Sequence, residues 1–232
     1  LTKGGAEMGK GHNALSPAWI ERAVEDSLRR LNTDVIDLYQ AHFPDPDTPQ
    51  EETLAAFDRL VKAGKVRAIG VSKHSAEATA EALAISARGG LARYQTLQPH
   101  YNLYSRATFE GPLQAVAVRE GLGAITYFSL ESGFLSGKYA SVDDLKGSPR
   151  AASLKDRFDE RGVRILATLR AVAARNQATP AQVALAWLLT RPGVAAPIVS
   201  ATTLEQLADT LKAVDLALSD ADVAELTAAS DA

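Results

Sequence analysis

The 232 residues are 46% hydrophobic and 23% charged, a balance typical of a globular protein with one substantial core. Twenty-five basic and 28 acidic residues give a net charge of −3, and no run of Lys or Arg suits a phosphate backbone, so a nucleic-acid partner is not expected. The lack of Cys excludes disulfides, thiolate nucleophiles and Cys-bound zinc, and no apolar stretch approaches the roughly 20 residues of a membrane span. We therefore expect a cytoplasmic protein with no membrane partner.

The N-terminal part alternates helical periodicity with short apolar runs. A helix is expected over residues 16–31, where Ser16 and Pro17 supply an N-cap and a first-turn proline. The strand "DVIDLYQAH" follows over 34–42 and ends at His42. The next helix, within residues 48–65, is expected to open at Thr48 and Pro49.

The same alternation continues to the C-terminus. The expected strands are "VRAIGVS" (66–72), "RYQTLQPHYN" (93–102), "GAITYFSL" (123–130) and "AAPIVSA" (195–201). Residues 132–150 form a Gly- and Ser-rich insert with little periodicity, of the kind that is more often functional than idle. Helices are expected over 75–87, 109–120, 159–176, 179–190, from Thr203 onward, and 218–230.

Regular βα spacing predicts an α/β fold, and two architectures compete for it. A doubly wound open sheet needs a Gly-rich phosphate turn after an early strand, and no GxGxxG is present. We therefore expect a (β/α)8 TIM barrel, of which this chain holds about the last five βα units in a single domain over residues 1–232. Five strands cannot close such a barrel, so we expect about three further units before Leu1.

Several stretches together resemble the aldo-keto reductases. They are "LTKGG", "SLRRLNTDVIDLYQAHFPD", "EETLAAFDRLVKAGKVRAIGVS", "LQPHYNLYSR", "SGFLSGKY" and "TPAQVALAWLL", and they cover essentially the whole chain in the family's order. The resemblance implies a TIM-barrel oxidoreductase that reduces aldehyde or ketone carbonyls of small molecules with NADPH, or alternatively NADH.

The resemblance also implies two catalytic residues. Lys3 takes the position of the family lysine and His42 that of the family histidine, while the family's tyrosine and aspartate belong to the segment before Lys3. A phenol with a pKa near 10 is a poor acid at neutral pH, and a nearby ammonium lowers that pKa. Lys3 would have this effect on the tyrosine, while His42 would orient or polarise the carbonyl oxygen. Without the family, a lone strand-end histidine such as His42 is more often structural, because its ring nitrogens can bond to loop carbonyls.

The nicotinamide end of the cofactor is expected to contact residues at three strand ends. The family holds the carboxamide with a Ser-Asn pair and a Gln, which correspond to Ser72, Lys73 and Gln98. Lys73 departs from the pattern because an ammonium donates hydrogen bonds but cannot accept them. Tyr127 corresponds to the aromatic residue that stacks on the nicotinamide, with a core tyrosine as the alternative.

The pyrophosphate and adenosine ends follow. Phe128 and Ser129 replace the family's usual Ser-Pro, and the expected pyrophosphate contacts come from Leu130, Gly133, Ser136 and Lys138, with a flexible loop as the alternative. Ser200, Thr202 and Gln206 are expected at the adenosine. Thr203 stands where NADP-preferring relatives have an Arg for the 2′-phosphate, and Thr210 replaces a common Asn, so either NADPH or NADH fits this end.

The remaining histidines have no carboxylate or histidine at metal-ligand spacing, so no metal is expected. His12, His74 and His100 are interpreted as solvent or loop residues, with His100 as a candidate wall of the substrate pocket. Two other functions compete with the reductase. One is a nucleotide-binding regulatory subunit of the potassium-channel beta type, and the other is a catalytically inactive truncated form.

Overall fold

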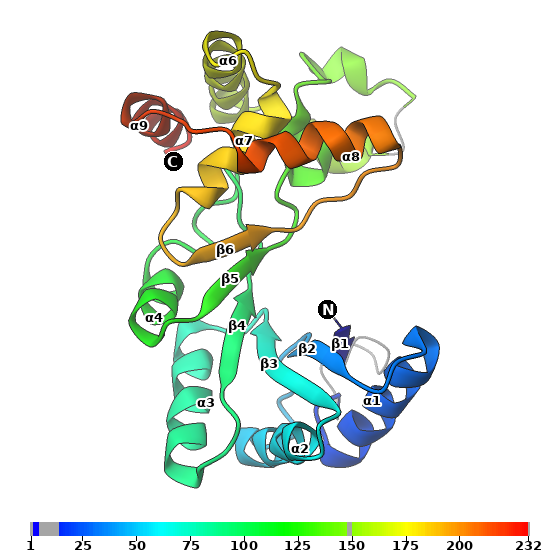
Figure 1. Ribbon diagram of the computed structural model, residues 1–232. Coiled ribbons are helices and arrows are strands. Elements are labelled where there is room, and N and C mark those ends of the chain that lie inside the picture. The colour runs from blue at the N-terminus through cyan, green and yellow to red at the C-terminus, as the bar shows by residue number, and fades with distance from the viewer. Residues whose placement is uncertain (1, 5–13, 148–149, 232) are drawn as a thin grey trace. The chain divides into compact units, whose positions relative to one another are not determined.

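Parallel strands alternate with helices in the protein, as Figure 1 shows for the computed structural model, which describes residues 2–4, 14–147 and 150–231. The predicted α/β class is confirmed. The chain divides into two compact units. Unit 1 comprises Leu1–Pro99 and Gly111–Ala124, and unit 2 comprises His100–Glu110 and Ile125–Ala232. A single domain over residues 1–232 stays a prediction.

Unit 1 is built on a parallel sheet whose strands pair in chain order. Each strand pairs with the next one along the chain, and Tyr39, Ile69 and Leu97 are among its buried side chains. The apolar runs therefore become strands because they bury both faces of a parallel sheet. The strands are β1 (Thr2–Gly4), β2 (Ile36–Ala41), β3 (Val66–Ser72), β4 (Tyr94–Gln98) and the first half of β5 (Gly123–Thr126).

Four helices cover this sheet: α1 (Pro17–Leu31), α2 (Gln50–Lys62), α3 (Ala76–Gly89) and α4 (Pro112–Glu120). Figure 1 shows α1, α2 and α3 in a row along one side of the sheet, and neighbouring helices contact each other. Ile20, Val24 and Leu28 are buried on one face of α1 at helical spacing. The amphipathic pattern of the sequence thus sets which face of the helix packs inward.

Two helix starts differ from the prediction. Helix α2 begins at Gln50 after Pro49, and the hydroxyl of Thr48 donates to Asp45 Oδ2 at 2.8 Å instead of capping the helix. Helix α4 begins at Pro112, three residues after the predicted start at Phe109. A proline fixes the backbone for the first helical position, and Gly111 precedes it with a φ of 96° that only glycine adopts easily.

Unit 2 packs its helices around α7 (Pro180–Leu189), in which Trp187 and Leu188 are fully buried. Strand β6 (Val194–Pro197) follows α7, and the N–H of Ile198 donates to the C=O of Thr126 in β5 at 2.8 Å. The other elements are η1 (Glu131–Ser136), η2 (Val142–Leu145), α5 (Ala151–Leu154), η3 (Lys155–Arg157), α6 (Glu160–Arg175), α8 (Leu204–Leu211), η4 (Lys212–Val214) and α9 (Asp220–Ala229).

Both strands of unit 2 end earlier than the sequence predicts. Strand β5 stops at Thr126 because Phe128 takes a left-handed conformation, with φ of 53°, that a strand cannot continue. Strand β6 stops at Pro197 instead of residue 201. Within residues 14–147 and 150–231, no helix is both long enough and apolar enough to cross a membrane.

Candidate functional site

Several of the predicted site residues of unit 1 stand where its strands end. His42 directly follows β2, Ser72 is the last residue of β3, and Gln98 is the last residue of β4. Ser72 pairs with Gln98 across the β3–β4 register, and Lys3 pairs with Gln40 across β1–β2. Carboxyl ends of parallel strands meet at one edge of the sheet, which is where barrel folds carry their chemistry. The side chain of Lys3 lies outside what the structure describes, as does His12.

A buried network of neutral groups connects these strand ends. Gln98 Nε2 donates to Gln40 Oε1 at 3.0 Å, and Gln40 Nε2 donates to Thr96 Oγ1 at 3.1 Å. The hydroxyl of Ser72 donates to the backbone C=O of Gln98 at 2.9 Å. Gln40, Ser72 and Gln98 are at most 1% exposed. The network therefore fixes the Gln98 amide, whose Oε1 accepts no hydrogen bond from the described residues.

Gln40 was not predicted as a site residue. Its signal in the sequence is a polar side chain inside the apolar run "DLYQAH" of a buried strand. Gly70 leaves the space for this network, because a Cβ there would lie 2.2 Å from Thr96 Oγ1 and 3.0 Å from Gln40 Nε2. Glycine is required at this strand position by the close approach of its neighbours.

Lys73 has an unusual backbone and an aromatic neighbour. Its φ of 60° is left-handed, a conformation that asparagine adopts several-fold more readily than most residues. Its Nζ lies 3.9 Å from the centroid of the Phe43 ring, and the ring of His42 stacks on the same Phe43 at 4.3 Å. Phe43 therefore contacts both the imidazole of His42 and the ammonium of Lys73.

His74 lies in the loop between β3 and α3, as one half of its interpretation as a solvent or loop residue predicts, but it is not exposed to solvent. Its side chain is only 9% exposed, and its Nδ1 lies 2.9 Å from the backbone carbonyl of Ser72. A carbonyl only accepts, so Nδ1 carries the proton in this bond. Burial lowers the pKa of His74, against a smaller opposite effect of this hydrogen bond. The ring is therefore neutral at neutral pH.

In unit 2, Tyr127 follows β5 and stacks on His100. Their ring centroids are 5.3 Å apart with an interplanar angle of 19°, and the two residues form an isolated parallel bridge. The next residue, Phe128, is 56% exposed and meets the His100 ring edge-on at 5.5 Å. Burial raises the pKa of Tyr127, which keeps its phenol neutral.

The buried carboxylate of Glu131 organises this region, and no sequence motif predicted its role. Glu131 is 5% exposed and accepts from His100 Nε2 at 2.9 Å, Asn102 Nδ2 at 2.6 Å and Arg157 Nε at 2.9 Å. Ser105 Oγ donates to the same carboxylate at 3.1 Å. Burial alone raises the pKa of Glu131, but the hydrogen bonds and the His100 charge outweigh it and lower the pKa to about 2.

This cluster gives His100 defined partners. The carboxylate of Glu131 orients its Nε2–H and Tyr127 covers one face of its ring, while its role as a wall of the substrate pocket stays a prediction. Asn102 stabilises the turn that follows His100, because its Oδ1 accepts from the N–H groups of Tyr104 and Ser105 at 2.8 Å each. These partners are up to 31 residues apart in the chain, so no local motif predicts them.

The stretch predicted at the pyrophosphate is a tight irregular turn. Glu131, Ser132 and Gly133 all have positive φ. A Cβ at Gly133 would lie 3.4 Å from Arg150 Nη1 and 3.6 Å from Lys138 Cε, so two cationic side chains reach this glycine. Arg150 also donates to the C=O of Ser132 at 2.7 Å, and Ser136 Oγ donates to the C=O of Gly133 at 2.6 Å. Arg150 was not among the residues that the sequence predicted at the pyrophosphate.

Ser129, next to the residues expected at the pyrophosphate, and Thr203, among those expected at the adenosine, have structural roles. Ser129 Oγ donates to the C=O of Ile198 at 2.9 Å and so joins the end of β5 to the end of β6. Thr203 is the N-cap of α8, and its Oγ1 accepts from the N–H of Gln206 at 3.2 Å. The N–H and hydroxyl of Thr202 both donate to Gln206 Oε1 at 2.9 Å. Thr202 and Gln206 therefore form one unit, and Ser200 precedes them in the same segment.

Unit 1 thus carries His42, Ser72, Lys73 and Gln98 at strand ends, and unit 2 carries the expected cofactor residues from Tyr127 onward. A sequence profile described as "Aldo/keto reductase family" matches residues 1–231. The chain is 34% identical to Protein tas of Escherichia coli (strain K12), over 93% of this chain and 67% of that protein.

Two relatives from Schizosaccharomyces pombe are also similar. One is named "Aldo-keto reductase yakc [NADP(+)]" and is 34% identical over 93% of this chain and 63% of its own length. The other is provisionally named a voltage-gated potassium channel subunit beta and is 32% identical over 87% of this chain and 60% of its own length. The chain spans 60% to 67% of the length of these relatives. The protein belongs to the aldo-keto reductase family, whose fold is a (β/α)8 barrel.

Proposed function

We propose that the protein reduces aldehyde or ketone carbonyls of small molecules to alcohols with a nicotinamide cofactor. The observation that carries this proposal is the set of strand-end residues in unit 1, where His42 follows β2 and the buried Ser72 and Gln98 end the next two strands. Family membership supports it, since one relative is named as an NADP(+) aldo-keto reductase.

The residues present fit such a cofactor. The amide of Gln98 is held by Gln40, which leaves its Oε1 to accept from a carboxamide N–H. The turn at Glu131–Gly133 presents a glycine with two cationic side chains beside it, Lys138 and Arg150, which suits a pyrophosphate dianion. Bound NAD(P)H would supply a hydride to the carbonyl carbon.

The protein's own part is polarisation and proton control. His42 donates a hydrogen bond to the carbonyl oxygen, where negative charge develops as the carbonyl is reduced. Lys3 lowers the pKa of the tyrosine that the family resemblance assigns as proton donor, because an ammonium favours the phenolate. Ser72, Lys73 and Gln98 orient the nicotinamide end, and Tyr127 covers its face.

The test is His42→Ala in the intact protein. We expect kcat/KM for benzaldehyde to fall at least 100-fold, as is typical when a general acid–base group is lost, with the Kd for NADPH within about 2-fold of wild type. Glu51→Ala, on the exposed first turn of α2, is the matched control and should keep full activity. Unchanged turnover in His42→Ala would remove this histidine from the mechanism.

A nucleotide-binding regulatory subunit is the second candidate, because one relative is provisionally named a potassium channel subunit beta. It predicts NADPH binding by the wild-type protein without turnover of any aldehyde or ketone in a broad panel. An inactive truncated form predicts neither binding nor turnover. The same binding and turnover assays therefore separate the three functions.

We propose NADPH as the preferred cofactor, with NADH as the alternative. Position 203 carries Thr203, the N-cap of α8, and therefore offers no guanidinium to the 2′-phosphate that distinguishes NADPH from NADH. The support for NADPH is the name of the NADP(+) relative. A ratio of Kd values for NADH over NADPH above about 10 would support NADPH, and a ratio below 1 would support NADH.

A further inference from the structure

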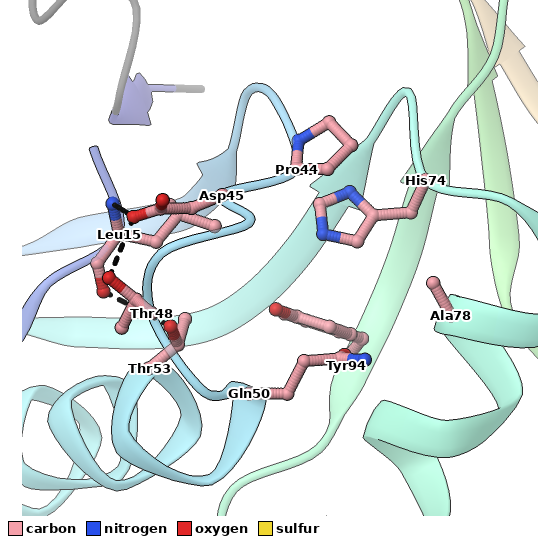
Figure 2. A pocket seen from close by; sticks show the side chains of 9 residues that line it. All are labelled: Leu15, Pro44, Asp45, Thr48, Gln50, Thr53, His74, Ala78 and Tyr94. Atoms are coloured by element: carbon pink, nitrogen blue, oxygen red, sulfur yellow. Dashed lines mark hydrogen bonds between the residues drawn. The ribbon is translucent and has the colours of Figure 1, made fainter. Parts of the chain in front are cut away.

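A small cavity lies in unit 1, beside the segment that joins β2 to α2. Its volume is about 90 Å³, whereas one buried water needs roughly 10–15 Å³ on the same measure. Figure 2 shows His74 and Tyr94 entering this space from one side and Thr48 and Thr53 facing it from the other. Pro44 is exposed, so the cavity reaches the surface beside it. The other lining residues are Leu15, Asp45, Gln50 and Ala78.

His74 offers the cavity a hydrogen-bond acceptor. Its Nδ1–H is used by the carbonyl of Ser72 at 2.9 Å, so Nε2 of the neutral ring carries a lone pair. Nothing in the described part of the chain makes a hydrogen bond to this Nε2. Burial favours the neutral form of the ring, which keeps the acceptor in place at neutral pH.

Tyr94 offers the cavity a hydrogen-bond donor. The side chain is 2% exposed, and its hydroxyl has no hydrogen-bond partner among the residues that the structure describes. Burial raises the pKa of this phenol, so the O–H stays protonated. This O–H is therefore available to a bound molecule that can accept a hydrogen bond from it.

The two threonine hydroxyls among the other lining groups donate inside the protein, and Gln50 uses one of its two amide N–H groups there. Thr48 Oγ1 donates to Asp45 Oδ2 at 2.8 Å, and Thr53 Oγ1 donates to the C=O of Leu15 at 3.0 Å. Gln50 Nε2 donates to Glu81 Oε2 at 3.2 Å. The threonine hydroxyls therefore have only acceptor capacity left for a bound molecule, whereas the Tyr94 hydroxyl keeps its O–H as a donor.

This inventory selects one chemical class. An ammonium ion could donate to His74 Nε2 but could not accept from Tyr94. A carboxylate or phosphate could accept from Tyr94 but would offer His74 no donor and would be repelled by Asp45. A hydroxyl group does both, and the volume admits several waters or one short alcohol.

We propose that this cavity is a binding site for a small hydroxylic molecule, water or a short-chain alcohol, which donates to His74 Nε2 and accepts from the Tyr94 hydroxyl. The site goes beyond the proposed reductase function and does not depend on it. It lies within unit 1 and uses none of the residues assigned to the cofactor or the carbonyl substrate.

The first experiment is a crystal structure of the intact protein, determined once without additive and once after soaking in 2-propanol. We expect an ordered oxygen within hydrogen-bond distance of both His74 Nε2 and the Tyr94 hydroxyl. A lone oxygen in both crystals identifies water, and density for the propyl carbons after soaking identifies an alcohol site. A direct His74–Tyr94 hydrogen bond, or no ordered oxygen at either atom, would overturn the proposal.

The second experiment follows the ¹⁵N signals of the His74 ring by NMR during titration with 2-propanol, ammonium chloride or sodium acetate. If the soaked crystal shows an alcohol, we expect a saturable shift with 2-propanol and none with the two salts, and an affinity about 3- to 10-fold weaker in Tyr94→Phe. If it shows water, we expect no saturable shift, but a nuclear Overhauser effect between water and His74 that Tyr94→Phe weakens. A saturable shift with either salt would contradict the proposal.

A cavity-filling pair supplies the control. Ala78→Leu places carbon in the lining and should abolish the water or alcohol signal, whereas Ala80→Leu, on the same helix but outside the lining, should leave it unchanged. Urea unfolding of both variants checks that each is folded. A signal that persists unchanged in folded Ala78→Leu would show that the molecule binds elsewhere.

Discussion

In unit 1 the strand-end residues are held by hydrogen bonds between neutral groups, whereas in unit 2 the corresponding region is held around a buried carboxylate. Gln40, Thr96 and Gln98 sit on paired strands of the sheet, and their network needs only amides and hydroxyls. Glu131 collects donors from His100, Asn102 and Arg157 across irregular turns. Backbone pairing between strands already fixes side-chain positions, while an irregular turn needs a strong polar centre to select one conformation.

The largest expected effect is that of Glu131→Gln. Removing one partner of a buried charged cluster leaves the remaining polar groups unpaired, so we expect a loss of about 2–4 kcal/mol in the free energy of unfolding. Urea denaturation measures it. Glu21→Gln is the control, because Glu21 pairs with Arg59 at 2.8 Å on the surface, where such pairs contribute at most about 1 kcal/mol. Equal effects of the two variants would contradict the comparison.

The pH dependence of stability tests the same difference. The pKa of Glu131 is lowered in the folded state to about 2 from an ordinary value of 4.5. Its contribution is therefore fully present above pH 4.5 and is lost as the pH falls from 4.5 towards 2. Over that window wild type should lose about 2–3 kcal/mol more than Glu131→Gln. Parallel stability curves for the two proteins would show that this carboxylate titrates normally.

The stability of unit 1 should depend on close packing around its strand-end network and not on a buried charge. In Gly70→Ala the new Cβ would lie 2.2 Å from Thr96 Oγ1, and overpacking of this kind costs about 1–3 kcal/mol. Thermal and urea unfolding measure the loss. Adding Thr96→Ala to Gly70→Ala removes the clashing oxygen and should restore part of the stability. A Gly70→Ala protein as stable as wild type would mean that the strands separate at no cost.

The smallest effect is expected for the cationic contact in unit 1. Lys73 Nζ lies 3.9 Å from the Phe43 ring centroid, and an exposed cation–π contact contributes about 0.5–1 kcal/mol. A double-mutant cycle with Lys73→Gln and Phe43→Leu isolates this coupling from the other effects of each change. A coupling energy near zero would show that the contact between Lys73 and Phe43 does not contribute measurably to the free energy of unfolding.

The sequence predicted the parts of the protein whose interactions are local or periodic. The apolar runs that became β2, β3 and β4 were identified, and Ser75 caps α3 where that helix was expected to start. The same apolar strand pattern correctly predicted that His42 stands at the end of β2. Strand patterns and helix caps are local, so one sequence is enough to find them.

The failures share a physical cause. The strand expected to run to Leu130 stops at Thr126, because Phe128 continues the apolar pattern while its backbone turns left-handed. The contact of His100 with Glu131 spans 31 residues, and only tertiary structure brings the two together. His74 lies in a loop, but its burial and its bond to the Ser72 carbonyl depend on the folded backbone and leave no local signal in the sequence.

The close approach at Gly70 has a consequence for how this protein can vary between species. The side chains at 40 and 96 occupy the space that a larger residue at 70 would need. Substitutions at 70 and 96 are therefore tolerated together more readily than singly, and an alignment of relatives should show correlated changes at these two positions. Such covariation would report the β3–β4 contact from sequences alone.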